Sequence, residues 1–75
     1  MIVFKQNRNF TYILNEINNF YISQKPESGD GNKEYYIYTN HTSLGKYKNL
    51  KQAENIIENL KLNFLNNKKY YLMPK

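Results

Sequence analysis

The sequence has no cysteine and no tryptophan, and its 75 residues include only three glycines and two prolines. The absence of cysteine excludes disulfide scaffolds, thiolate zinc sites, iron–sulfur centres and thiol nucleophiles. No apolar run approaches the roughly eighteen residues of a membrane span, and the N-terminal stretch turns polar after Phe4, so a signal peptide is not expected either. These absences predict a cytoplasmic protein that makes no membrane contact.

Acidic residues are also few. Six Asp and Glu face eleven Lys and Arg, which gives a formal net charge of +5 and favours anionic partners. Hydrophobic residues make up 40% of the chain and aromatic residues 16%, eight of them tyrosine, which is enough apolar surface to support a folded core. A chain of this length predicts one domain, residues 1–75.

The side chains that carry catalysis are scarce. His41 is the single histidine, the acids are dispersed, and neither a Gly-x-Ser-x-Gly motif nor a phosphate-binding glycine loop occurs. We therefore expect that the protein is not an enzyme, that it has no catalytic residues, and that it binds no metal or cofactor. A slow hydrolase that uses His41 together with Glu34 stays open as an alternative.

The clearest predicted element is a helix over residues 49–66. Asn49 followed three residues later by Gln52 is a capping-box arrangement. Apolar residues then recur at three- and four-residue steps, which predicts one buried stripe: Leu50, Ala53, Ile57, Leu60 and Phe64, with Ile56 beside them. Leu62 falls outside this stripe, and it is either an exposed leucine, which is the simpler interpretation, or part of a second contact.

The rest of the chain predicts strands, because its segments are rich in aromatic and β-branched residues and are separated by turn-forming residues. These segments are residues 1–5, 10–14, 19–23, 35–39, 44–47 and 70–73, with a long hairpin loop over residues 26–32. Short connections favour antiparallel neighbours. The predicted fold class is therefore α+β: a largely antiparallel meander of about five strands, with one C-terminal amphipathic helix packed on one face.

Alternation along two of these strands predicts which side chains point outward. If Ile22 and Ile37 face the helix, then Tyr21, Tyr36 and Tyr38 share the opposite face. A register shift of one residue would invert this assignment. An exposed sheet face rich in tyrosine is typical of a docking surface.

Interleaved basic and aromatic residues suggest binding, because lysine and arginine neutralise phosphates and tyrosine rings stack on bases. The candidate ligand- or partner-binding residues are Arg8, Lys33, Tyr36, Tyr38, Lys46 and Lys48. The alternative is a structural role, in which the tyrosines are half-buried on the sheet and the lysines only keep the protein soluble.

Three segments carry a resemblance to known proteins: Tyr35-Tyr36-Ile37-Tyr38, the stretch from Leu44-Gly45-Lys46-Tyr47 to Ala53, and the closing Tyr71-Leu72-Met73-Pro74. Together they resemble small proteins of phages and mobile elements, in which a strand ending in Leu-Gly-x-Tyr enters a helix with an early alanine. Members with assigned roles are often non-enzymatic antagonists of bacterial immunity, such as anti-CRISPR proteins or sponges for nucleotide signals. The resemblance implies a phage-type inhibitor, in the host cytoplasm, that binds a host defence protein or sequesters its anionic nucleotide signal. The basic pI of about 9.5 differs from the acidic anti-CRISPR proteins that mimic DNA.

Two further expectations concern partners. The net charge supports an alternative function as a small basic nucleic-acid-binding or regulatory protein. Strand edges that need covering, together with Leu62 outside the helix stripe, favour a homodimer.

Overall fold

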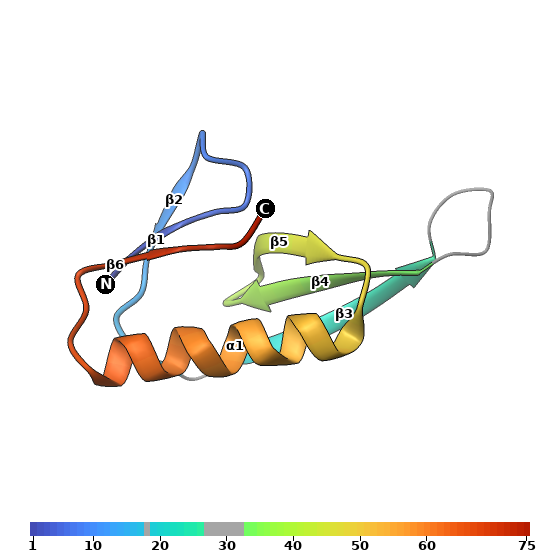
Figure 1. Cartoon of the computed structure of the whole chain (residues 1–75). Coiled ribbons are helices and arrows are strands. Elements are labelled where there is room, and N and C mark those ends of the chain that lie inside the picture. The colour runs from blue at the N-terminus through green and yellow to red at the C-terminus, as the bar shows by residue number, and fades with distance from the viewer. Residues whose placement is uncertain (18, 27–32) are drawn as a thin grey trace.

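The computed structural model describes residues 1–17, 19–26 and 33–75. Its elements are β1 (Ile2–Phe4), β2 (Thr11–Ile13), β3 (Phe20–Pro26), β4 (Lys33–Thr39), β5 (Thr42–Tyr47), α1 (Leu50–Leu65) and β6 (Tyr70–Leu72). All six predicted strand segments form strands, and the single helix confirms the α+β class (Figure 1). The loop predicted over residues 26–32 lies, after Pro26, outside the described residues. No helix among the described residues is long and apolar enough to cross a membrane.

The prediction of one five-stranded meander is wrong. The strands form two three-stranded sheets, one in the order β2-β1-β6 and the other in the order β3-β4-β5. β1 pairs antiparallel with β2 but parallel with β6, in the register Ile2 to Tyr70 and Phe4 to Leu72. A parallel pair needs a long crossover connection, and here nearly the whole chain lies between the two strands. Short-range patterns predict only pairings between neighbours in sequence, so they could not reveal this one.

The helix begins and ends as its terminal residues dictate. The Asn49 side chain accepts a hydrogen bond from the Gln52 backbone N–H at 3.1 Å, which caps the N-terminus. At the other end Asn67 adopts a left-handed φ of 59°, and the Lys68 N–H reaches back to the Asn63 carbonyl at 3.0 Å. This is a Schellman motif, with asparagine in the position that glycine usually takes.

Replacing Asn49 with alanine is expected to lower the free energy of unfolding by about 1 kcal/mol, because the first turn loses its side-chain acceptor. Urea denaturation followed by far-UV circular dichroism measures the change. Asn55→Ala is the matched control: Asn55 is exposed within the same helix, where alanine is the better helix former. An equal loss in both variants would contradict a capping role for Asn49.

The buried stripe of α1 meets the inner faces of both sheets in one hydrophobic core. The helix contributes Ala53, Ile56 and Leu60, so Ile56 rather than the predicted Ile57 is the more deeply buried of the adjacent pair. Leu62 is 57% exposed, which confirms the simpler interpretation of this leucine. Among the described residues, the buried hydrophobic side chains are Val3, Leu14, Ile37, Leu44, Tyr47, Ala53, Ile56, Leu60, Tyr71 and Met73.

A close approach at Gly45 holds β5 against the C-terminal segment. The Tyr47 ring lies across Gly45, and its hydroxyl donates a hydrogen bond to the Pro74 carbonyl at 2.6 Å. A β-carbon at Gly45 would lie 2.9 Å from that hydroxyl and 3.0 Å from the β-carbon of Gln6. Glycine therefore leaves the space that the buried tyrosine occupies.

Candidate functional site

The outer face of the β3–β4–β5 sheet brings tyrosine and lysine side chains together. Cross-strand pairs place Tyr21 opposite Tyr38, and Tyr36 opposite Lys46. Ile22 pairs with Ile37 on the inner face, where Ile37 is completely buried. Paired residues share a face and alternate residues switch sides. The predicted alternation is therefore confirmed, and we call the outward set Tyr21, Lys25, Tyr36, Tyr38 and Lys46 the tyrosine–lysine face.

Three rings form a row across this face. The ring centroids of Tyr21 and Tyr38 are 5.2 Å apart with planes only 8° from parallel. The Tyr36 and Tyr38 centroids are 6.3 Å apart at 29°. These separations lie within the range in which aromatic rings attract one another. The row is therefore a pre-ordered aromatic surface, not three independently moving side chains.

Lys25 lies over this row. Its ammonium nitrogen is 4.6 Å from the centroid of the Tyr36 ring and 5.6 Å from that of Tyr38, both within cation–π distance. It also donates a hydrogen bond to the Tyr38 hydroxyl at 3.0 Å. This hydrogen bond is the main cause that raises the pKa of Lys25 above its usual value of 10.5. The ammonium is consequently positive across the physiological pH range.

Lys46 supplies a second positive charge at the β5 side of the face. Its ammonium lies 3.5 Å from the Glu34 carboxylate, and its side chain is nevertheless 59% exposed. Its backbone is fixed by the Gln6 side chain, which accepts from the Lys46 N–H at 2.8 Å and donates to the Lys46 carbonyl at 2.9 Å. Gln6 thereby covers part of the β5 edge and holds Lys46 in place.

Two hollows open at the two ends of the ring row. One, of about 200 Å³, is lined by Tyr36 and Lys46 together with Lys5, Gln6, Asn7, Ser43, Leu44 and Gly45. The other, of about 420 Å³, is lined by Tyr21 together with Asn19, Phe20, Asn40 and His41. A flat ligand on the rings would therefore have room for substituents at either end.

The six predicted binding residues divide into two groups. Tyr36, Tyr38 and Lys46 come together on the tyrosine–lysine face. The other three lie elsewhere. The Arg8 guanidinium donates to the carbonyls of Phe4 at 3.3 Å and Lys5 at 2.8 Å. Lys33 is next to Glu34 in β4 and so lies on the opposite side of that strand, and Lys48 follows the end of β5. One terminal nitrogen of Arg8 is thus bound to the turn between β1 and β2.

Sequence reasoning left Lys25 out of the candidate set. The alternation of side chains along the strand could have indicated Lys25, because Tyr21, Ser23 and Lys25 occupy alternate positions of β3 and so share one face. The strand was expected to end at residue 23, whereas it continues to Pro26 and brings Lys25 over the rings.

The pairing of His41 with Glu34 does not form. Glu34 lies at the start of β4 and His41 in the turn beyond its end, so about 17 Å or more of extended strand separates them. Within the described residues, no three histidine, aspartate or glutamate side chains gather in a way that could hold a metal ion.

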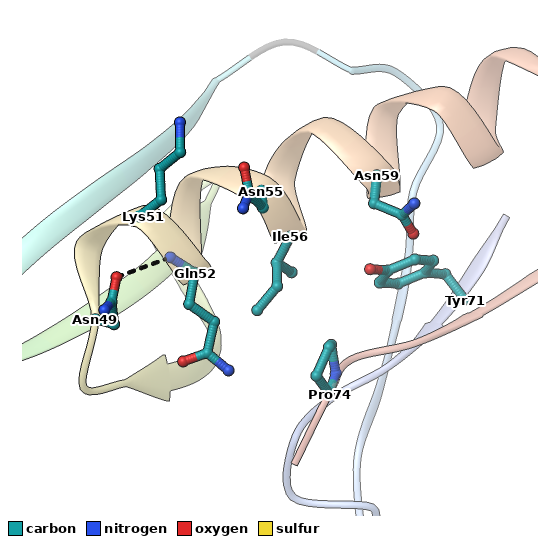
Figure 2. A pocket seen from close by; sticks show the side chains of 8 residues that line it. All are labelled: Asn49, Lys51, Gln52, Asn55, Ile56, Asn59, Tyr71 and Pro74. Carbon is teal, nitrogen blue, oxygen red and sulfur yellow. Dashed lines mark hydrogen bonds between the residues drawn. The ribbon is translucent and has the colours of Figure 1, made fainter.

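A groove of about 730 Å³ lies between α1 and the C-terminal segment (Figure 2). It is lined by Asn49, Lys51, Gln52, Asn55, Ile56, Asn59, Tyr71 and Pro74. Its polar groups are mainly amides, and Asn49 is already engaged in capping the helix. Burial raises the pKa of Tyr71 above its ordinary value of 10, further from the range in which it could act as a base near neutral pH. The groove offers one charge, Lys51, and carries no acid–base pair.

No protein family model matches the sequence, and comparisons with curated proteins and with solved structures give no match either.

Proposed function

We propose that this protein is a non-enzymatic, phage-type inhibitor of a bacterial defence system that works in the host cytoplasm. In this proposal the tyrosine–lysine face sequesters the anionic nucleotide signal of that system. The anti-defence setting comes from the resemblance of residues 35–38, 44–53 and 71–74 to small phage proteins. The binding mode comes from the arrangement of the side chains.

The observation that carries the proposal is the row of Tyr21, Tyr38 and Tyr36, in which the Lys25 ammonium lies over the rings of Tyr36 and Tyr38. A nucleobase stacks on such a ring whatever its hydrogen-bonding edge, and lysines beside the ring neutralise the attached phosphate. Lys25 is exposed, so its ammonium can leave the ring surface and follow a phosphate while a base takes its place.

Of the two modes that the resemblance implies, signal capture suits this face better than blockade of a protein. A protein–protein contact relies on a well-packed apolar centre surrounded by a polar rim. Here the centre of the face has a cation over its rings, and Lys46 with Glu34 lies beside them. Such a surface suits a small anion with a flat ring.

Isothermal titration calorimetry with a cyclic dinucleotide and with adenosine monophosphate tests the proposal. Stacking on tyrosine contributes about 1–3 kcal/mol per base, so Tyr38→Leu should weaken binding roughly 5- to 150-fold. Tyr38→Phe keeps the ring and loses only the hydroxyl bonded to Lys25, so its affinity should stay within about threefold of the original. Absence of nucleotide binding, or equal losses in both variants, would contradict the proposal.

The net charge of +5 favours one alternative, a small basic nucleic-acid-binding protein. Binding to random single-stranded DNA or RNA should weaken steeply as salt rises, because each neutralised phosphate releases a counterion. A nucleotide held mainly by stacking should show a shallow salt dependence. Two variants show which charge is responsible: Lys25→Gln on the tyrosine–lysine face and Lys51→Gln on the exposed helix surface. If the protein binds a nucleotide, only Lys25→Gln should weaken binding. If it binds nucleic acid through its overall charge, both variants should weaken binding.

A further inference from the structure

Within the residues that the structure describes, the outer face of the β2–β1–β6 sheet is apolar and largely exposed. The register places six side chains on it: Ile2, Phe4, Thr11, Ile13, Tyr70 and Leu72. Three of them are largely exposed, Ile13 at 62%, Tyr70 at 58% and Leu72 at 59%. Phe4 and Tyr70 are in ring contact, with centroids 6.2 Å apart. Five of the six are large and apolar, and none of them is charged.

The opposite face of the same sheet is apolar as well. Val3 and Tyr71 occupy the alternate positions and are buried in the core. A strand with one solvated face alternates apolar and polar residues, whereas a strand covered on both faces is apolar throughout. β1 and β6 have the second pattern, although the structure shows a cover on one side only.

We infer that a second copy of this chain covers this face, which makes the protein a symmetric homodimer joined through the β2–β1–β6 sheets. The inference is independent of the proposed function, because the tyrosine–lysine face lies on the other sheet.

The chemistry of the face favours a second copy over other occupants. Residues 27–32 are Glu-Ser-Gly-Asp-Gly-Asn and have no apolar side chain to cover it from within this chain. The six side chains of this face carry no charge, so they give a different protein no charge pattern to recognise, whereas two copies can place the same apolar side chains against each other across a twofold axis. Lys68 and Lys69 lie at the edge of the face, where they line a hollow of about 480 Å³ together with Ile2, Ile13 and Tyr70.

The size of the face fits a small dimer interface. A large aromatic side chain has roughly 150–250 Å² of surface to bury, so the exposed parts of these five residues offer on the order of 400 Å². With a rim of neighbouring residues this approaches the roughly 800 Å² that each partner contributes to an interface of standard size. A dissociation constant in the micromolar range is expected.

Sedimentation velocity from about 1 to 500 µM protein measures the association. The original chain should sediment at twice its 9.1 kDa mass at the upper concentrations. Leu72→Lys and Ile13→Lys should each remain monomeric throughout, because each places a charge among the apolar side chains of this face, one on either edge strand. Leu62→Lys is the matched control, since Leu62 is equally exposed but lies on the helix, and it should dimerise as the original chain does. A monomeric original chain, or dimers of unchanged affinity in both sheet variants, would overturn the inference.

Two further measurements separate dimerisation from other effects. The thermal midpoint should rise with protein concentration for the original chain and for Leu62→Lys, but not for the two sheet variants. Circular dichroism at low concentration checks that all four proteins are folded.

Added salt should tighten the dimer, because it screens the repulsion between two chains of charge +5, whereas it should weaken contacts to anions. If the original chain stays monomeric but floats with neutral phosphatidylcholine vesicles, a lipid surface is the occupant and the inference is wrong.

Discussion

Replacing Leu60 with alanine is expected to lower the free energy of unfolding by about 3–4 kcal/mol. Leu60 is completely buried in the middle of α1, where the helix packs on the sheets. Truncation of a buried leucine removes its transfer free energy and leaves a cavity that the neighbours fill only in part. A domain of this size has a total stability of about 4–11 kcal/mol, so the variant should be only marginally folded.

Leu62 provides a control of identical chemistry two residues away. It is 57% exposed, and Leu62→Ala should change the free energy of unfolding by less than about 0.5 kcal/mol. Urea denaturation followed by tyrosine fluorescence measures both variants, at one protein concentration so that self-association affects them equally. If Leu62→Ala were the more damaging change, α1 would bury the side that carries Leu62 and not the side that carries Leu60.

Those two leucines also show what local sequence can predict. The spacing of apolar residues assigned Leu60 to the core and Leu62 to the surface, because helical periodicity depends only on residues within a few turns. The cap at Asn49 follows from residues equally close in sequence. The β3–β4 hairpin, with Ile37 inward and Tyr36 outward, is likewise a pairing of chain neighbours.

The division into two sheets was beyond such reasoning. β6 joins β1 in parallel across most of the chain length, and no short-range pattern specifies that pairing. The apolar outer face of the β2–β1–β6 sheet arises from the same pairing. Ile2 and Phe4 alone suggest only a hydrophobic strand, and Tyr70 and Leu72 must lie beside them before the surface exists.

A related reason explains which of the candidate binding residues lie together. Tyr36, Tyr38 and Lys46 share one face because they lie on neighbouring strands joined by a short turn, in which Asn40 and His41 both adopt left-handed φ values. Arg8 lies apart from these three residues because the conformation of its turn directs one terminal guanidinium nitrogen to the carbonyls of Phe4 and Lys5. The type of residue indicated a phosphate ligand, but a residue type does not specify where the turn places its side chain.

Raising the pH above 10 is expected to destabilise the protein through Tyr47. Burial raises the pKa of Tyr47 from its ordinary 10 to about 12, and the neighbouring Tyr71 contributes in the same direction, while Arg8 lowers the value slightly. The folded protein therefore holds this proton more tightly than the unfolded chain does. The stabilisation is complete below pH 10 and is lost as the pH rises from 10 toward 12. The loss should reach about 1 kcal/mol by pH 11, once solvent screening is allowed for.

Tyr47→Phe isolates this effect from the other groups that titrate in alkali. At pH 7 the variant should be less stable by about 1 kcal/mol, because the hydrogen bond to the Pro74 carbonyl is lost and that oxygen is left without its donor. Lysine deprotonation near pH 10.4 affects both proteins alike and cancels in their difference. The difference in unfolding free energy should therefore shrink above pH 10 and approach zero near pH 11. A difference that stays constant from pH 8 to pH 11 in urea titrations would show that the Tyr47 hydroxyl is not held in the buried, hydrogen-bonded position that joins β5 to the C-terminal segment.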